Sequence, residues 1–444
     1  QMNKQFVKNI YEKTPSGIKR LFSRTIRNRL INNKVFRKQY DLLVRAEQMT
    51  NSEVDTIQQQ ELKKICIYAY ENCDFYKNEF DKNGFNPYDF TVDDFIGKVP
   101  IIDKNIVLNN IEGINSRAID DSYEAVTGGS SGKRLVVNTT MECLYKEYAF
   151  VYHHYTKFTK SYDYKRSSLA YIGGYGDTLI SENPLYAMRI YNSMQINKET
   201  ISKVVKDINS YKPEFIRGLP SAIYFFCKLI KLNNLKIGYP VDGIILQSEN
   251  IYPYQSEAIK GVFNCEILTH YGHTERVVFG EQQLNEKGLC YRFNKLYGYT
   301  ELANDGRIIS TGFINYKMPL IRYATDDYAE LVAGDLYKIR GHREKTMYGK
   351  HGELVSLASF TDTSAVFEKI EKYQFVQEEL GHVLLRIVPA IGFTEQEYKK
   401  VHEFLNEKAQ GIIDFSVQTV DDIEYKTRGK FDLLIQKLSE TAND

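Results

Sequence analysis

The chain contains no hydrophobic run that approaches the roughly 18 consecutive apolar residues of a membrane-spanning helix. Its opening stretch, QMNKQFVKNI, also lacks the apolar core that a secretory signal peptide carries. No cysteine belongs to a C-x-x-C pair, although six are scattered over 444 residues, and this argues against a cysteine zinc site. Scattered thiols and missing export signals predict a cytoplasmic protein.

Charge is unevenly distributed along the chain, although the net charge is only +1. Residues 1 to 40 hold 11 Lys and Arg against one acid, Glu12, whereas the remaining residues hold 47 Lys and Arg against 56 Asp and Glu. Apolar residues of this basic arm recur at helical spacing and predict an amphipathic helix: Ile18, Leu21, Phe22, Ile26 and Leu30. Such a helix either packs on its own domain with a solvated basic face, or contacts an acidic partner or the inner membrane face.

Strand-like and helix-like segments alternate through the middle of the chain, which predicts layered α/β structure. The strand-like segments are LVVN, SSLAYIGG, EFIRG, DGIILQS and CEILTHYG. A T-x-x-E capping box at Thr139–Glu142 predicts a helix over residues 140–158, with an apolar face that includes Met141. Residues 60–120 predict helices and turns, and Pro220 opens the predicted helix PSAIYFFCKLIKL.

The pattern changes from about residue 345 onward. HVLLRIVPA, a helix at residues 394–409 and IIDFSVQTV predict a compact α+β domain of ordinary size. We therefore expect a large N-terminal domain at residues 1–342 and a small C-terminal domain at residues 343–444.

The segment TGGSSGK, which begins at Thr127, resembles loops of three enzyme classes. The nucleophile elbow of a hydrolase requires a helix directly after the serine, but the strand-like KRLVVN follows here. A P-loop requires Gly in place of Thr127 and Ser or Thr in place of Arg134. The remaining functional interpretation is an anion-holding loop with backbone N–H groups, the Ser130 and Ser131 hydroxyls and the Lys133 charge. An ordinary Gly/Ser turn is the alternative.

Six segments fall in the order seen in the acyl-adenylate-forming ligases, in the branch of phenylacetate–CoA ligase and the CapK-like adenylating proteins of capsule biosynthesis. The segments are VTGGSSGK, ILQSENIYP, THYGHTE, STGFINYKMPLIRYATDD, IRGHREKTMYGKHGELV and TRGKFDLLI. They resemble, in turn, the family's phosphate loop, adenine-side segment, YGxTE motif, PLIRYxTGD segment, interdomain hinge and the C-terminal element with the adenylating lysine. The resemblance covers residues from about 60 to 437.

The resemblance implies a role for individual residues of each segment. Those implied to hold the ATP phosphates are Thr127, Gly128, Ser130, Ser131, Gly132 and Lys133. Those implied on the adenine side are Ser248, Glu249, Asn250, Tyr271, Gly272 and Thr274. Glu275 matches the acid that holds Mg²⁺, and Asp327 matches the acid that accepts from the ribose hydroxyls. Lys430 matches the lysine that bridges the substrate carboxylate and the α-phosphate.

The chain departs from the family pattern in two segments. The family's TGD is Thr325-Asp326-Asp327 here, so that Asp326 is a competitor of Asp327 for the ribose. At the hinge, His342 replaces an arginine that contacts the nucleotide, and Arg343 either compensates or leaves that contact weaker.

The resemblance implies a ligase that uses ATP and Mg²⁺ to convert a carboxylic acid into acyl-AMP and pyrophosphate, followed by acyl transfer as the small domain rotates. Coenzyme A, an amino acid or a sugar derivative is the expected acceptor, and no nucleic-acid partner is expected. Candidates for the acyl pocket, by their position relative to the motifs, are Tyr152, His153, the Gly173-Gly174-Tyr175 turn and Pro220-Ser221. The alternative is a non-catalytic nucleotide-binding protein recruited to membranes by its basic arm. The joint presence of Glu275 and Lys430 argues against it.

Overall fold

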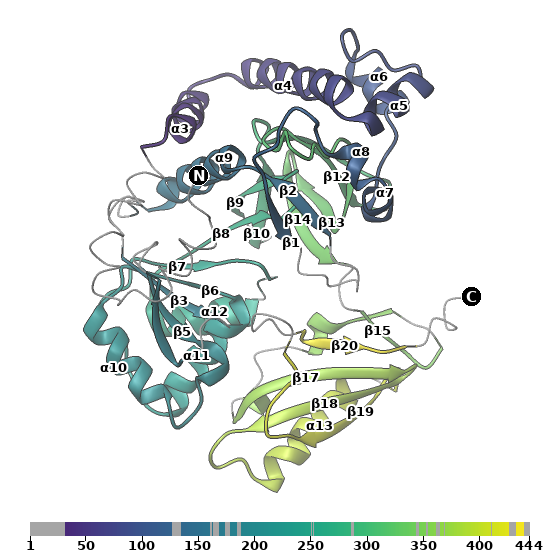
Figure 1. Ribbon diagram of the computed structural model, residues 1–444. Helices are drawn as coiled ribbons and strands as arrows, with labels where there is room; N and C mark the ends of the chain where they lie inside the picture. The colour runs from purple at the N-terminus through teal and green to yellow at the C-terminus, as the bar shows by residue number, and fades with distance from the viewer. Residues whose placement is uncertain are drawn as a thin grey trace. The chain divides into compact units, whose positions relative to one another are not determined.

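A computed structural model describes most of the chain (Figure 1). The described residues are 32–126, 135–159, 162, 168–173, 178–183, 188–249, 251, 253–285, 288–342, 346–351, 354–360, 365–367, 369–409, 411–425 and 432–438. They form two compact units. The first unit uses Thr25–Arg166 and Leu268–His342, and the second uses Ser167–Ile267 and Arg343–Asp444.

Short helices open the described part of the first unit, as the sequence of residues 60–120 predicts. They are α3 (Lys34–Ala46), α4 (Asn51–Asn72), α5 (Asp74–Lys82), α6 (Val92–Lys98), α7 (Lys104–Asn109) and α8 (Ile111–Ile114). Thr50 and Thr91 begin α4 and α6 with capping boxes, and Asp103 accepts from the Ile106 amide to begin α7. Helix α4 buries one face at helical spacing, which consists of Leu62, Ile65, Cys66 and Ala69.

The main sheet of the first unit is antiparallel, with strand order β11-β12-β13-β14-β10-β9-β8. Its strands are β8 (Glu266–Gly272), β9 (Phe279–Asn285), β10 (Gly288–Phe293), β11 (Gly298–Leu302), β12 (Arg307–Gly312), β13 (Tyr323–Ala333) and β14 (Leu336–His342). A separate antiparallel pair, β1 (Tyr123–Val126) and β2 (Val136–Thr139), flanks residues 127–134. The strand β2 leads into helix α9 (Met141–Phe158).

The N-terminal helices are joined to the sheet by buried side chains and by backbone hydrogen bonds. The Tyr76 hydroxyl donates to the Pro319 carbonyl at 2.8 Å and accepts from the Ile321 amide at 3.1 Å. The extended residue Ile102 bonds the backbone on both sides of Tyr323, through Arg322 and Ala324. These contacts fix the start of β13, which carries Asp326 and Asp327.

The second unit contains the parallel sheet that the alternating sequence pattern predicts. Its order is β7-β6-β3-β5-β4, and only β4 is antiparallel to its neighbour. The strands are β3 (Leu169–Gly173), β4 (Ile180–Asn183), β5 (Met188–Asn192), β6 (Phe215–Gly218) and β7 (Gly243–Leu246). The 3-10 turn η2 (Ser193–Gln195) follows β5, and helices α10 (Ile201–Tyr211), α11 (Pro220–Leu232) and α12 (Pro253–Phe263) cover the sheet (Figure 1). Pro220 is in the first turn of α11, as predicted.

The C-terminal part of the second unit has its own hydrophobic core, with buried residues from Met347 to Leu434. It contains a small hairpin of β15 (Thr346–Tyr348) and β16 (Leu354–Ser356), and a mixed sheet in the order β19-β18-β17-β20. The elements are β17 (Ile370–Glu379), β18 (His382–Pro389), α13 (Glu395–Ala409), β19 (Asp414–Thr419), β20 (Leu434–Gln436) and the 3-10 turns η3 (Leu357–Phe360) and η4 (Ala365–Phe367). The α+β character is as predicted, while the domain limits at residues 342 and 343 stay a prediction.

The predicted helix at residues 140–158 is confirmed, and Tyr145, Tyr148, Ala149 and Tyr152 pack in the core, but the expected N-cap and the inclusion of Met141 in the apolar face are wrong. Thr140, rather than Thr139, is the N-cap, because its side chain accepts from the Cys143 amide. Met141 is exposed, and the buried face instead includes His153 and His154. The histidines are buried because the helix packs on strands that follow it by more than 100 residues.

All six cysteines lie in described residues, and all are free. Five are buried and Cys265 is half-buried. Burial raises the pKa of the Cys73 and Cys143 thiols to about 12. Within the described ranges, no helix is both long and apolar enough to cross a bilayer.

A substitution of Gly218, at the end of β6, would test how tightly the parallel sheet is packed. A Cβ at this position would lie 2.3 Å from the Ile172 carbonyl oxygen, which belongs to the neighbouring strand. We expect Gly218→Ala to lower the free energy of unfolding by about 1–3 kcal/mol, because the Ile172 backbone would have to shift and strain the sheet. Urea denaturation measures the change.

Gly238→Ala is the matched control, since the nearest atom to its added Cβ would be 3.7 Å away. We expect it to change the free energy of unfolding by less than about 0.5 kcal/mol. Equal effects of the two substitutions would contradict the packing argument.

Candidate active site

The turn after β8 brings Glu275 to the end of the first unit's sheet. The Arg276 amide donates to the His273 carbonyl at 3.1 Å, which closes the turn around Thr274 and Glu275. Arg276 adopts a left-handed backbone with φ of +55°. Tyr271 and Gly272 are the last residues of β8 and therefore lie directly before the turn.

Tyr271 and Asp327 lie 56 residues apart in sequence but are in contact. The Tyr271 hydroxyl donates to Asp327 Oδ2 at 2.7 Å, and the Asp327 amide donates to Thr325 Oγ1 at 3.2 Å. Burial, and then the Asp327 carboxylate, raise the pKa of Tyr271 well above its usual range. Asp327 on β13 pairs with His342 on the neighbouring strand β14. The backbone of the predicted hinge residue therefore lies beside that of the predicted ribose acid.

Glu275 is held as a carboxylate by its neighbours. His273 Nδ1 lies 3.2 Å from Glu275 Oε2, and each side chain is only 15% exposed. Burial alone raises the pKa of Glu275, but His273 and the Lys104 ammonium outweigh it, so that this pKa is lower than usual. The same contact raises the pKa of His273, although burial opposes it. Burial and then the Glu275 carboxylate also raise the pKa of Tyr323.

Asp326 has a different neighbour from Asp327. Lys104 Nζ lies 3.7 Å from Asp326 Oδ2, and the Asp326 side chain is 41% exposed. The partner of Asp327 is instead Tyr271, at the end of β8. This arrangement favours Asp327 over Asp326 as the acid that faces a ligand beside Tyr271.

Ser248 and Glu249 belong to the second unit and follow β7. Ser248 adopts a left-handed backbone with φ of +68°. The Ser221 amide donates to Glu249 Oε2 at 3.1 Å, so the carboxylate lies at the N-terminus of α11, where the helix dipole favours negative charge. Ser221, expected near the acyl pocket, and the predicted adenine-side segment are thus in contact.

The structure brings together Tyr271, Gly272, Thr274, Glu275 and Asp327 in the first unit, and Ser248 and Glu249 in the second. A Cβ on Gly272 would meet only ordinary contacts, with the nearest atom at 3.7 Å, so protein packing alone does not require glycine there. Of His342, the structure describes the backbone alone. The other predicted site residues lie outside the described ranges: Thr127, Gly128, Ser130, Ser131, Gly132, Lys133, Gly174, Tyr175, Asn250, Arg343 and Lys430.

Lys104 and Tyr323 are neighbours of the site that sequence reasoning missed. Tyr323 lies in PLIRYATDD, which belongs to one of the six segments that resemble the family, and Lys104 lies in VPIIDKN, but nothing in their local pattern links them to Glu275. Their proximity depends on the backbone pairing of Ile102 with Tyr323, which joins segments more than 200 residues apart.

Comparison with known families and proteins shows a fold shared with solved CoA ligases and amido synthetases. Residues 347–437 match the family model described as the CapK C-terminal domain. Over 392 residues the chain is 22% identical to Protein CapK of Staphylococcus aureus, with 81% of this chain and 84% of that protein covered.

Two solved structures are similar to most of the chain. One is 2-hydroxyisobutyryl-CoA ligase in the postadenylation state with R3-HIB-AMP, at a TM-score of 0.65 and 14% identity, covering 87% of this chain and 90% of that chain. The other is the acyl acid amido synthetase AtGH3.15 with 2,4-DB, at a TM-score of 0.51 and 11% identity, covering 87% and 89%. These findings confirm the predicted resemblance and the mixed α/β fold with a small C-terminal domain.

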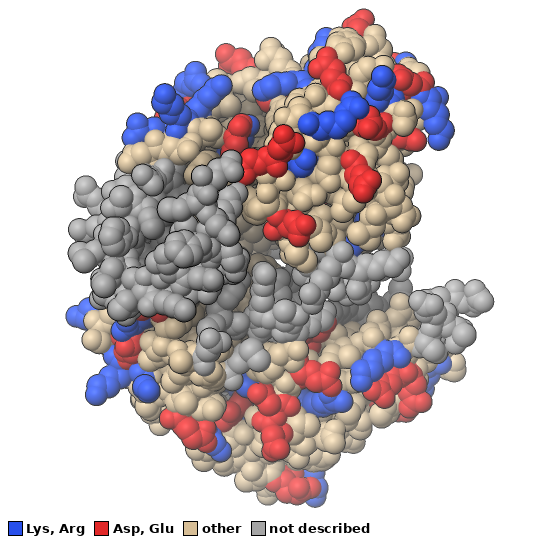
Figure 2. All heavy atoms as spheres, viewed as in Figure 1, with Lys and Arg blue, Asp and Glu red and all other residues tan. Residues whose placement is uncertain are grey.

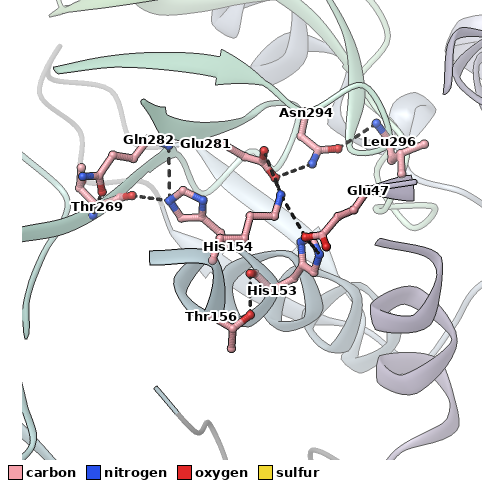
Figure 3. A network of polar contacts seen from close by, with 10 residues as sticks. Glu47, His153, His154, Thr156, Thr269, Glu281, Gln282, Asn294 and Leu296 are labelled. Carbon is pink, nitrogen blue, oxygen red and sulfur yellow. Dashed lines mark hydrogen bonds and ion pairs between the residues drawn. The ribbon is translucent and has the colours of Figure 1, made fainter. Parts of the chain in front are cut away.

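Helix α9 carries a buried polar network on the other side of β8 (Figure 3). His154 Nε2 lies 2.7 Å from the Thr269 carbonyl oxygen, which fits a tautomer that donates from Nε2. His153 Nε2 lies 3.0 Å from Glu47 Oε1, and Lys157 Nζ lies 3.4 Å from Glu281 Oε1. Sequence analysis placed His153 at an acyl pocket, but its nearest charged partner is Glu47 from the end of α3.

His154 makes the stability of the first unit sensitive to acid. The side chain is 1% exposed, and burial lowers its pKa from 6.5 to about 4. The unfolded chain therefore binds a proton between about pH 6.5 and 4 that the folded chain does not, so stability falls as the pH falls through this window.

We expect the free-energy advantage of the natural chain over His154→Gln to shrink by about 2 kcal/mol between pH 7 and pH 5, because glutamine does not titrate. Urea denaturation at each pH measures the difference. A difference that is the same at pH 7 and pH 5 would contradict a buried, neutral His154.

Proposed function

We propose that this chain, which has the fold of the adenylate-forming ligases and a CapK C-terminal domain, activates a carboxylic acid with ATP. One observation carries the proposal: Tyr271, Glu275 and Asp327, which the sequence resemblance links to the nucleotide and its metal, meet at one edge of the first unit's sheet. The Tyr271 hydroxyl donates to Asp327 at 2.7 Å, and Glu275 lies in the turn that directly follows Tyr271 and Gly272, which supports a shared site. Convergence of distant segments on one place supports a shared ligand.

Asp327 is proposed to bind the ribose. An ionised carboxylate has two oxygens and about four acceptor sites, so it accommodates the Tyr271 hydroxyl and further donors together. The ring of Tyr271 then lies beside the nucleoside, and Gly272 adds no side chain there. By the family resemblance, Ser248, Glu249 and Asn250 are proposed to contact the adenine.

Glu275 is proposed to hold Mg²⁺. The described residues contain no group of three or more His, Cys, Asp or Glu side chains placed for a metal, so an all-protein cage is not available in them. Mg²⁺ suits this donor set, because it binds through one or two carboxylates, retains waters and takes the remaining ligands from phosphates. The lowered pKa of Glu275 keeps its carboxylate ionised at neutral pH. When bound, the ion would neutralise phosphate charge.

In the proposed reaction, a carboxylate oxygen of the substrate attacks the α-phosphorus of ATP. A new oxygen–phosphorus bond forms acyl-AMP, and the bond to the β,γ-phosphates breaks to release pyrophosphate. Catalysis consists mainly of positioning and charge neutralisation. Thr127, Gly128, Ser130, Ser131, Gly132 and Lys133 are proposed to hold the departing phosphates, Lys430 to bridge the two reacting anions, and His342 and Arg343 to act at the hinge.

The second half-reaction is proposed to transfer the acyl group to a thiol, amine or hydroxyl. The two similar structures are named a CoA ligase and an amido synthetase, so relatives of this fold use both thiol and amine acceptors. The resemblance to capsule-biosynthesis adenylating proteins supports a role in capsular or surface polysaccharide formation. Coenzyme A, an amino acid and a sugar derivative are therefore the acceptors to test first.

Peripheral membrane contact through residues 1–40 is also a proposal, for an otherwise cytoplasmic protein. Helix α3 buries Phe36 and Leu43, and its outer side exposes Lys34, Arg37 and Lys38, which contributes to the blue region over α3 in Figure 2. The amphipathic helix predicted around residues 18–30 lies outside the described residues. The exposed cations of α3 support the proposal, because they leave a surface for anionic lipid.

Adenylation is tested by ATP–pyrophosphate exchange with a panel of carboxylic acids. We expect exchange that requires both an acid and Mg²⁺. Glu275→Gln should raise the Mg²⁺ concentration for half-maximal exchange by at least about 10-fold, because a neutral amide is a poor ligand for a hard cation. Binding of ATP without exchange or acyl-AMP for any acid would favour the non-catalytic alternative.

Lys430 is tested by measuring both half-reactions in one variant. Lys430→Ala should slow adenylation by about 10²–10³-fold, the range for the loss of one electrostatic contact to the transition state. Transfer from supplied acyl-AMP should persist. If both half-reactions slow equally in a folded variant, Lys430 is not the adenylating lysine.

A further inference from the structure

The turn that presents Glu275 has a backbone that needs external support. Arg276, the next residue, has a φ of +55°, in the left-handed region that residues with a Cβ avoid. Arginine lacks the short polar side chain with which Asn or Asp stabilises this conformation locally. The surrounding elements must therefore hold the turn in place.

Two glycines support the turn from the strand side. A Cβ on Gly312 would lie 2.5 Å from the Arg276 carbonyl oxygen, and a Cβ on Gly298 would lie 2.4 Å from the Val277 carbonyl oxygen. The backbone of Arg276 and Val277 is thus packed directly on the backbone of β11 and β12, which only glycine permits. The turn cannot shift toward these strands.

Helix α9 holds the turn from the other side through a buried ion pair. Arg276 Nε donates to Glu147 Oε2 at 2.7 Å, and Arg276 is only 8% exposed. The Glu147 side chain is 23% exposed. Burial by itself lowers the pKa of Arg276, but the Glu147 carboxylate outweighs it and raises that pKa. An arginine that loses this partner would be a buried, uncompensated charge.

The same helix also holds the strand that leads into the turn. His154 Nε2 contacts the Thr269 carbonyl, and the Tyr155 hydroxyl lies 2.8 Å from His270 Nδ1. Side chains of α9 therefore contact residues immediately before Tyr271 and immediately after Glu275. Since α9 is a single rigid element, it fixes both ends of the segment that carries the candidate ligand groups.

We propose that Glu147 and Arg276 are positioning residues, which fix the Glu275 carboxylate for metal and phosphate binding without contacting the nucleotide themselves. This inference rests on the proposed role of Glu275. A ligand group that is displaced by even a fraction of an ångström loses much of its effect, so the ion pair should influence metal dependence more than nucleoside binding.

The test is Glu147→Gln, which keeps the side-chain shape and removes the charge. We expect the Mg²⁺ concentration for half-maximal ATP–pyrophosphate exchange to rise by about 10-fold, the lower range for loss of a partner that orients a metal ligand. Calorimetric binding of AMP without Mg²⁺ should stay within about 2-fold, because Tyr271 and Asp327 are unchanged. Arg276→Lys, which keeps the charge but not the fork of donors, should give a smaller shift in the same direction.

Asp207→Asn is the matched control. It breaks the Arg189–Asp207 pair of the second unit, in which both hydrogen bonds are 2.9 Å long, by the same acid-to-amide change. We expect it to lower the melting temperature without moving the Mg²⁺ dependence. Equal shifts of the Mg²⁺ dependence in the two variants would overturn the inference, because a general loss of stability would then explain both shifts.

Calorimetric titration of Mg·ATP gives a second measurement that does not depend on knowing the acid. Weaker Mg·ATP binding in Glu147→Gln, with AMP binding retained, supports positioning, and unchanged Mg·ATP binding overturns it. Glu275→Gln is run in parallel to separate the two hypotheses. If Glu275→Gln leaves the Mg²⁺ dependence unchanged, the role of Glu275 fails, and the positioning role fails with it.

Discussion

A buried arginine in left-handed conformation, paired with a glutamate from a distant element, occurs at both edges of the candidate site. Arg276 follows Glu275 and pairs with Glu147, and Arg322 precedes β13 with a φ of +49° and pairs with Glu301. The left-handed backbone costs about 1–2 kcal/mol at each arginine. Removing one partner of a buried pair costs about 3–5 kcal/mol, because it leaves the other charge buried and uncompensated. The proposed position of the Glu275 carboxylate depends on the first of these pairs, and the second joins β11 to the residue before β13.

Local sequence patterns were sufficient to predict the elements whose signals are local. Alternating segments predicted the strands β3, β6 and β7 of the second unit but not β4 or β5, and Pro220 predicted the start of α11. The antiparallel strands β9–β14 were not predicted, because their burial follows pairing between segments rather than a regular period along each one. The buried histidines of α9 were missed for the same reason, since Thr269 lies 115 residues from His154.

The candidate site shows the same division. The resemblance named Tyr271, Glu275 and Asp327, and the structure supplies the 2.7 Å contact between the first and the last. The resemblance did not name Lys104 or Glu147, because the residues that they contact are distant in sequence and become neighbours only in the folded chain. Coulombic attraction explains why these residues matter: burial favours the neutral form of Glu275, and nearby cations reverse that preference. A sequence motif identifies a carboxyl group, but the pKa of that group depends on its neighbours in the folded protein.

The buried thiols have a practical consequence. A thiol reacts as its thiolate, and burial both shields these sulfurs and suppresses that form, with a pKa of about 12 for Cys73, Cys143 and Cys265. Maleimide and nitroxide reagents at neutral pH should therefore leave the folded chain largely unmodified. A single cysteine introduced on the surface of each unit would accept a spectroscopic label without prior removal of the native six. Distances between two such labels, measured with and without Mg·ATP, would then test whether a nucleotide changes the separation of the units.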